Sequence, residues 1–196
     1  MHRAGGTAPT LVGDDVVAIT DNAERRMHVV FYNRHTGERL CSEPVFPPGK
    51  GATANSLVAV GDSVIVENNY GYTSPAATML GHTTAGGIAR VRLTAHGCET
   101  VWTSEEVAPT SVPKVSLASG LLYVYAKPAN SLGIDAWYFT AIDLRTGETV
   151  YKQLTGTGIQ WNNHYAAIYL GPGGAAYIAT IAGMVRLADS DHEEVS

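Results

Sequence analysis

The stretch WYFTAIDLRTGETVYKQL, from Trp137 to Leu154, decides the fold of this chain. A run rich in aromatic and β-branched residues precedes the polar turn Arg145-Thr146-Gly147-Glu148, and a second β-prone run follows from Thr149. Two such runs joined by a short turn that contains glycine are typical of a β-hairpin. The segment therefore predicts two antiparallel strands.

Similar turns occur at two other places, each between two β-prone runs. They are Arg34-His35-Thr36-Gly37-Glu38 and Thr94-Ala95-His96-Gly97-Cys98. Gly37 and Gly97 lie 60 residues apart, and Gly97 and Gly147 lie 50 residues apart. Repeats of roughly 40–50 residues are typical of the four-stranded blades of β-propellers. The repeat predicts an all-β chain built as a β-propeller segment.

A second marker gives the number of blades. Each repeat opens with a short strand that ends in glycine, at Gly13, Gly61, Gly120 and Gly171, and a β-branched or aromatic strand follows each glycine. We therefore expect one propeller region over residues 1–196 with about four blades. The predicted blades span about residues 7–47, 53–105, 110–155 and 161–189, and residues 190–196 form a polar tail.

The fourth repeat offers only three strands before the polar tail, so the last blade is expected to be incomplete. A four-bladed array also leaves sheet faces uncovered. Two explanations are open. The chain is part of a larger ring of six to eight blades, which we favour, or a second copy of the chain completes the ring.

Composition agrees with a β protein. Charged residues make up 16% of the 196 residues, below the usual figure of ~25%, and there are 21 glycines. The net charge of −5 offers no basic face to a nucleic acid, so no nucleic-acid partner is expected. The longest apolar runs, Leu121–Ala126 and Tyr165–Leu170, have six residues each. A membrane-spanning helix needs ~20, so no span is expected.

The Thr36-Gly37-Glu38 and Thr146-Gly147-Glu148 turns resemble the repeats of pyrroloquinoline-quinone-type (quinoprotein-like) β-propellers. Several longer strings look like those of a group of uncharacterised bacterial secreted propeller proteins. This resemblance implies the propeller fold and a secreted or periplasmic location, and it supplies no catalytic residues. The strings are Asn55-Ser56-Leu57, Glu67-Asn68-Asn69-Tyr70-Gly71-Tyr72, Ser111-Val112-Pro113-Lys114-Val115-Ser116, Trp137-Tyr138-Phe139-Thr140-Ala141-Ile142-Asp143 and Asn162-Asn163-His164-Tyr165.

Quinone-dependent dehydrogenases have a tryptophan-docking motif in most blades and often an adjacent cysteine pair. Here Trp102, Trp137 and Trp161 do not recur at one blade position, and the two cysteines are far apart in the sequence. We therefore expect no pyrroloquinoline quinone.

The two cysteines, Cys41 and Cys98, fall at the predicted outer strands of neighbouring blades. They are either two partly buried thiols or a disulfide that closes a loop of about 57 residues. A disulfide would require an oxidising compartment.

Polar residues near the strand ends predict a site at one mouth of the central channel. Asp21, Glu67, Asn55 and Asn163 would offer the oxygen ligands that calcium prefers. In residue types they resemble the metal set of gluconolactonase-type propellers, which makes a calcium-dependent lactonase-type hydrolase the first alternative function. Asp and Asn at strand ends also cap turns, which is the structural interpretation of the same pattern.

Amide and aromatic side chains together favour a sugar or a planar ligand. The candidate ligand-binding residues are Asn55, Asn68, Trp161, Asn163 and His164. His164 would act as a general base if a carboxylate such as Glu67 oriented it, which makes these two the catalytic candidates. The structural alternative is a histidine satisfied by its neighbours.

The sequence thus predicts a binding or scaffold module, with a small molecule or another copy of the chain as partner, and leaves open whether it is an enzyme. A second alternative is a protein-binding face on the insertion at residues 70–86.

Overall fold

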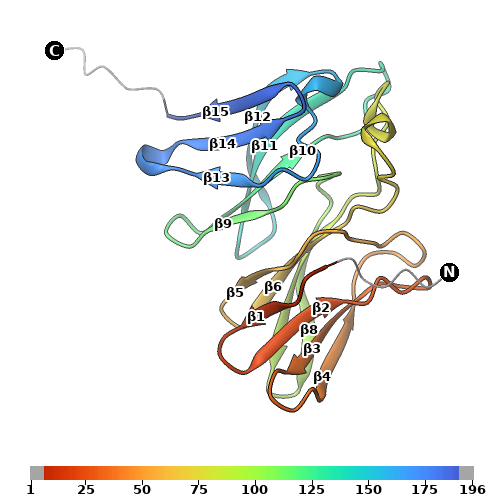
Figure 1. Cartoon of the computed structure of the whole chain (residues 1–196), viewed down its shortest axis with the longest axis vertical. Coiled ribbons are helices and arrows are strands. Elements are labelled where there is room, and N and C mark those ends of the chain that lie inside the picture. Colours follow the sequence, from red (N-terminus) through yellow and green to blue (C-terminus); the bar gives the residue numbers. More distant parts are fainter. Residues whose placement is uncertain (1–6, 190–196) are drawn as a thin grey trace.

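The computed structural model describes residues 7–189, so the predicted polar tail at 190–196 lies outside the described residues. These residues form four antiparallel sheets, which follow one another along the chain (Figure 1). Each sheet is a meander in which neighbouring strands are consecutive in the sequence. We call the sheets blades 1 to 4.

Blades 1 to 3 have four strands each, and blade 4 has three. Blade 1 contains β1 (Thr10–Val12), β2 (Val16–Thr20), β3 (His28–Asn33) and β4 (Arg39–Pro44). Blade 2 contains β5 (Val58–Val60), β6 (Ser63–Glu67), β7 (Ile88–Thr94) and β8 (Gly97–Ser104). Blade 3 contains β9 (Lys114–Ser116), β10 (Leu121–Ala126), β11 (Ala136–Asp143) and β12 (Thr149–Thr157). Blade 4 contains β13 (Ile168–Leu170), β14 (Ala176–Thr180) and β15 (Gly183–Leu187).

The predicted fold class is confirmed: the chain is an all-β propeller segment of four blades, and the last blade is incomplete. Three short 3-10 helices lie between strands, η1 (Pro75–Thr78), η2 (Ile159–Trp161) and η3 (Pro172–Gly174). Within residues 7–189, no helix has the length and apolar character needed to cross a membrane.

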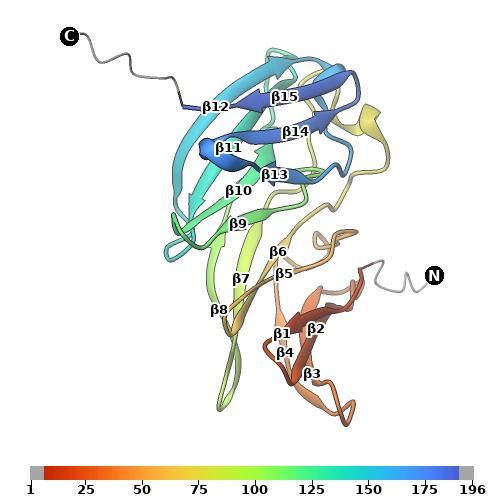
Figure 2. The same ribbon diagram turned by 60° about the vertical axis from the view of Figure 1, so that its left-hand side comes forward.

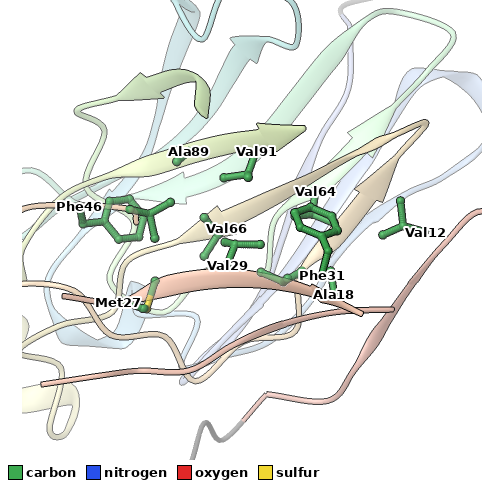
Figure 3. Close-up of a cluster of buried hydrophobic side chains, with 12 residues drawn as sticks. Val12, Ala18, Met27, Val29, Phe31, Phe46, Val64, Val66, Ala89 and Val91 are labelled. Atoms are coloured by element: carbon green, nitrogen blue, oxygen red, sulfur yellow. The ribbon is translucent and has the colours of Figure 1, made fainter. Parts of the chain in front are cut away.

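Successive blades pack face to face, and the core lies between them. Ala18, Val29 and Phe31 of blade 1 face Val64 and Val66 of blade 2, and all of these side chains are buried (Figure 3). Successive side chains of a strand point to opposite faces, so a blade between two others must be apolar on both. β10 shows this arrangement. Its Leu122 and Val124 belong to the core shared with blade 2, while Tyr123 and Tyr125 pack in the core shared with blade 4.

Equivalent strands of neighbouring blades lie next to each other. The innermost strands β1 and β5 are neighbours, and the Thr10 hydroxyl donates a hydrogen bond of 3.0 Å to the Leu57 carbonyl. At the outer edge, a disulfide joins Cys41 of β4 to Cys98 of β8, with Cα atoms 5.9 Å apart. Blades 1 and 2 are therefore tied together at both their inner and outer strands.

Trp102 of β8 ties blade 2 to blade 3. Its Nε1 donates to the Leu144 carbonyl at 3.0 Å, and its ring lies directly against Gly147 in the β11–β12 turn. A Cβ atom at Gly147 would come within 2.7 Å of the ring, and the backbone there has a φ of +77°. Gly147, one of the glycines that mark the repeat, is thus also required by the packing between blades 2 and 3.

We expect Gly147→Ala to lower the free energy of unfolding by about 2 kcal/mol or more, because it adds both backbone strain and a clash with Trp102. Gly37→Ala is the matched control. Gly37 occupies the equivalent turn of blade 1 with a φ of +73°, but no atom lies within 4 Å of its added Cβ. That variant should lose only about 1 kcal/mol. Urea denaturation followed by circular dichroism measures both, and equal losses would contradict the packing role of Trp102.

The insertion at residues 70–86 of blade 2 is fixed against the loop at residues 127–136 of blade 3. Lys127 is fully buried and pairs with Asp135 at 3.1 Å between Nζ and Oδ1, and it also donates to the His82 carbonyl. The Asp135 carboxylate accepts hydrogen bonds from the backbone N–H groups of Leu80 (3.1 Å) and Gly81 (2.8 Å). A buried charge needs such partners. This ion pair therefore holds the insertion over blade 3.

Candidate functional site

One edge of the blade array gathers the segments that can form a site. In a four-stranded meander, the loop between the second and third strands leaves from the same edge as the connection to the next blade. We call this edge the loop face. It carries the insertion at residues 70–86 of blade 2 and the loop at residues 127–136 of blade 3. Figures 1 and 2 show the yellow η1 segment of blade 2 reaching the ends of the blue strands of blade 4. There Asn162 Nδ2 donates to the Thr78 hydroxyl at 3.2 Å.

A cleft of about 780 Å³ opens among these loops. Its walls come from the loop after β2, the connection between blades 1 and 2, the segment after β6 and the lead into β13. Ligand pockets in proteins typically have volumes of roughly 300–1,000 Å³. The lining residues are Asn22, Ala23, Glu24, Gly49, Gly51, Ala52, Thr53, Ala54, Asn69, Tyr70, Gly71, Tyr72, Thr73 and Tyr165.

Three tyrosines give the cleft an aromatic wall. Tyr72 and Tyr165 pack edge to face, with ring centroids 5.4 Å apart. Tyr70 is 44% exposed on the same segment as Tyr72. Burial raises the pKa of Tyr72 to about 12, and it also raises the pKa of Tyr165. Both phenols are therefore neutral at neutral pH and can donate hydrogen bonds.

Tyr165 is held in an unusual backbone conformation. His164 and Tyr165 have φ values of +40° and +67°, which non-glycine residues adopt at a cost of roughly 1 kcal/mol or more each. The buried Asn162 supports this turn by accepting a hydrogen bond from the His164 N–H at 2.7 Å, and the Tyr72 hydroxyl meets His164 Nδ1 at 2.9 Å. These contacts direct the Tyr165 ring toward Tyr72.

A buried polar network centred on Glu67 lies behind the cleft. One Glu67 oxygen accepts from Asn55 Nδ2 at 2.7 Å, and the other accepts from Asn69 Nδ2 at 2.6 Å. The second N–H of each amide goes to the connection between blades 2 and 3: Asn55 donates to the Ser111 carbonyl and Asn69 to the Pro109 carbonyl. The network therefore joins blade 2 to the chain that enters blade 3.

Both Glu67 oxygens accept hydrogen bonds, and each of the two side chains that contact them presents an N–H group. Asn69 Oδ1 already accepts from the Ala54 N–H and the Thr53 hydroxyl, so its amide group cannot turn over. Burial raises the pKa of the Glu67 carboxyl well above its usual range, and the hydrogen bonds from Asn55 and Asn69 oppose that shift.

The floor of the cleft is fixed by paired amide contacts. Asn22 donates to the Thr53 carbonyl at 2.8 Å and accepts from the Thr53 N–H at 3.0 Å. Asn68 accepts from the Ala52 N–H and donates to the carbonyls of Lys50 and Gly86. The connection between blades 1 and 2 therefore has a defined shape, as a binding site requires.

The predicted site residues fall into separate groups. Asn55 and Glu67 are in direct contact, whereas Asn163 lies near the lead into blade 4 and accepts from the Thr110 hydroxyl at 2.7 Å. His164 contacts Tyr72, whereas both oxygens of Glu67, the carboxylate expected to orient it, accept hydrogen bonds from Asn55 and Asn69. Trp161 is packed beside Gly156 at the core shared by blades 3 and 4, and Asn68 supports the floor of the cleft.

The residues predicted to bind calcium are largely occupied by other partners. Asp21 accepts from the N–H groups of Ala23 and His28 and contacts the His28 ring at 2.8 Å, so it caps its own loop. Both Glu67 oxygens accept from amides. Within the described residues, no group of three or more His, Cys, Asp or Glu side chains is placed to hold a metal ion. Calcium binding and lactone hydrolysis remain predictions.

Sequence reasoning missed four residues that shape the cleft: Asn22, Asn69, Tyr72 and Tyr165. The string Glu67-Asn68-Asn69-Tyr70-Gly71-Tyr72 held a usable signal, because two amides and two tyrosines follow directly on a buried strand. Nothing local to Tyr165 indicated that it would meet Tyr72, which is 93 positions earlier in the sequence.

Comparisons with known proteins support the fold. No family model matches the chain. An uncharacterised protein of Archaeoglobus fulgidus is 29% identical over 91 residues, which is 46% of this chain and 17% of that protein. The crystal structure of quinohemoprotein alcohol dehydrogenase from Comamonas testosteroni superimposes with a TM-score of 0.58 at 14% identity, over 95% of this chain and 33% of that chain.

TolB from Acinetobacter baumannii is a more distant structural neighbour, with a TM-score of 0.46 at 10% identity over 93% of this chain and 43% of that chain. The class that the fold defines is the β-propeller. The chain spans about a third of the length of the quinohemoprotein and less than a fifth of the archaeal protein.

Proposed function

We propose that this chain is a binding module whose loop-face cleft takes a neutral saccharide. The observation that supports this most directly is the wall formed by Tyr70, Tyr72 and Tyr165 beside a cavity of about 780 Å³. Aromatic rings pack against the C–H faces of a sugar, while phenol and amide groups hydrogen-bond its hydroxyls.

The charge of the lining favours an uncharged ligand. Glu24 is the single charged residue among those that line the cleft within the described range 7–189. An anionic ligand would be buried without a positive partner, which is costly. Phosphorylated sugars and uronic acids should therefore bind more weakly than their neutral counterparts.

A ligand in the loop-face cleft would meet a preformed surface. Tyr165 is held by the turn at Asn162, and the floor is held by Asn22 and Asn68. A site that is ordered before binding loses less entropy when the ligand arrives. Glu67 acts here as a positioning residue, because it accepts a hydrogen bond from Asn69, which lines the cleft.

A panel of neutral mono- and disaccharides, each paired with its phosphorylated or uronic acid form, tests this proposal by isothermal titration. We expect a neutral sugar to bind and Tyr165→Ala to weaken it about tenfold or more, since losing one stacked ring is worth roughly 1–2 kcal/mol. Tyr151→Ala is the control, because Tyr151 is an exposed tyrosine of the outer strand β12 and is absent from the cleft. Absence of binding at 10 mM for every neutral sugar, or equal affinity for the two variants, would contradict the proposal.

We also propose that the protein works outside the reducing cytosol. The Cys41–Cys98 disulfide supports this, because disulfides persist mainly in oxidising compartments. Secretion or a periplasmic location, as the sequence resemblance implies, would supply that environment.

A further inference from the structure

Two turns on the loop face expose large apolar side chains. One turn follows η1 in the insertion of blade 2, and the other lies in the loop between β10 and β11. Their backbones touch, since the Asn130 N–H donates to the Gly81 carbonyl at 2.9 Å. Large apolar side chains that gather at one place in solvent typically mark an interaction surface. We call them the apolar tips, and they are Met79, Leu80 (73% exposed), Leu132 (82% exposed) and Ile134.

The backbone of Leu80 is held in a conformation that leucine rarely adopts. Its φ is +55°, in the left-handed region where glycine or asparagine is the usual residue. The Asp135 carboxylate fixes this turn by accepting hydrogen bonds from the N–H groups of Leu80 and Gly81, and Asp135 is itself paired with the buried Lys127. A strained and firmly anchored residue whose side chain is left in solvent points to a function for that side chain.

Backbone N–H groups of both turns have partners inside the two loops. In the turn of blade 2, the Asp135 carboxylate takes up two of them, as described above. In the turn of blade 3, Asn130 Oδ1 accepts from the N–H groups of Leu132 and Ile134, and the Asn130 carbonyl accepts from the Gly133 N–H. A loop in water needs no such partners, because water accepts from free N–H groups. A loop that enters an apolar medium does need them.

The two loops that carry the apolar tips have no net charge from acidic or basic side chains. Residues 70–86 contain no Asp, Glu, Lys or Arg, and residues 127–136 contain only Lys127 and Asp135, which pair with each other. A protein partner typically forms about one hydrogen bond per 100–200 Å² of interface. The tips instead offer apolar side chains on turns whose N–H groups are already bonded. They therefore match a partner that requires neither charge nor hydrogen bonds.

We propose that the apolar tips enter the surface of a membrane of zwitterionic lipids. Leu80 and Leu132 insert at the boundary of the acyl chains, where burial of apolar side chains drives binding. Tyr70, which is exposed on the same insertion, lies at the level of the headgroups, where tyrosine is enriched. The net charge of −5 disfavours an anionic surface. This inference is independent of saccharide binding, because none of the four tips lines the cleft.

Flotation of the protein with phosphatidylcholine vesicles tests the proposal. We expect half of the protein to float with the vesicles at a lipid concentration on the order of 1 mM, and phosphatidylglycerol should not increase this fraction. Protein that stays unbound at about 10 mM phosphatidylcholine would overturn the proposal and favour an apolar site on a protein partner instead. A bound fraction that rises when phosphatidylglycerol is added would overturn the choice of zwitterionic lipids.

The double variant Leu80→Asn with Leu132→Asn should raise the lipid concentration needed for half binding by about tenfold or more. Asparagine adopts the left-handed conformation more readily than leucine, so Leu80→Asn should unfold at the same urea concentration as the wild type or a higher one. This result would separate lost lipid contact from lost folding.

The matched control is Leu117→Asn. Leu117 is 74% exposed in the turn between β9 and β10, at the edge of blade 3 opposite the loop face. This variant should float with the vesicles like the wild type. A folded double variant that binds as well as the wild type, or an equal loss in the double variant and Leu117→Asn, would overturn the role of the apolar tips.

Discussion

Removal of the Cys41–Cys98 disulfide is expected to lower the free energy of unfolding by about 4 kcal/mol. The two cysteines are 57 residues apart, so the bond restricts a long loop of the unfolded chain. The double variant Cys41→Ala with Cys98→Ala removes the bond without leaving a reactive thiol. Urea denaturation followed by tryptophan fluorescence measures the loss.

The wild-type protein in dithiothreitol provides the matched control, and it should unfold at nearly the same urea concentration as the double variant. The oxidised protein should show no reactive thiol without denaturant. A loss below about 1 kcal/mol, or two thiols that titrate in the native protein, would contradict a stabilising bond between β4 and β8.

Glu67→Gln is expected to cost about 3 kcal/mol near pH 5, the second large effect. Asn55 and Asn69 both direct N–H groups at the carboxyl, and their other hydrogen bonds prevent either amide from turning over. The glutamine NH₂ would therefore face another donor, which leaves buried polar groups unpaired. Glu148→Gln, in the exposed turn before β12, is the control and should change stability little.

The effect of Glu67→Gln should depend on pH. Burial raises the pKa of Glu67 in the folded protein above its value in the unfolded chain. Between these two values the folded state retains a proton that the unfolded state has released, so the stability that Glu67 contributes is present at low pH and decreases as the pH rises. The gap between wild type and Glu67→Gln should shrink from pH 4.5 upward. A gap that widens with pH would show that the two amide hydrogen bonds outweigh burial.

Much of the fold could be predicted because the blades repeat. The Thr-Gly-Glu turns at Gly37 and Gly147 and the strand-ending glycines are local signals, and the alternation of a strand needs no knowledge of distant residues. The same register placed Cys41 and Cys98 on neighbouring outer strands, where the structure joins them. The three-stranded blade 4 seen within residues 7–189 also followed from the order of the repeats.

The cleft could not be predicted in the same way, because it depends on a loop that crosses between blades. Tyr72 meets His164, 92 positions later in the sequence, and Asp135 accepts hydrogen bonds from Leu80 and Gly81, more than 50 positions earlier. Contacts between residues so far apart in the sequence have no periodic signal. Aligning polar residues by blade position brought Asn55 together with Glu67 correctly, but it also grouped them with Asp21, which contacts its own loop.

Saccharide binding in the loop-face cleft is tested most directly by mapping the bound sugar onto the ¹⁵N-labelled protein. Addition of the tightest-binding neutral sugar should shift the backbone amide signals of Ala52, Ala54 and Gly71, which line the cleft, and leave that of Tyr151 on β12 in place. The same titration of Tyr165→Ala should produce much smaller shifts at equal sugar concentration. Shifts that cluster away from the cleft, or no shift at all with any neutral sugar, would contradict the proposed site.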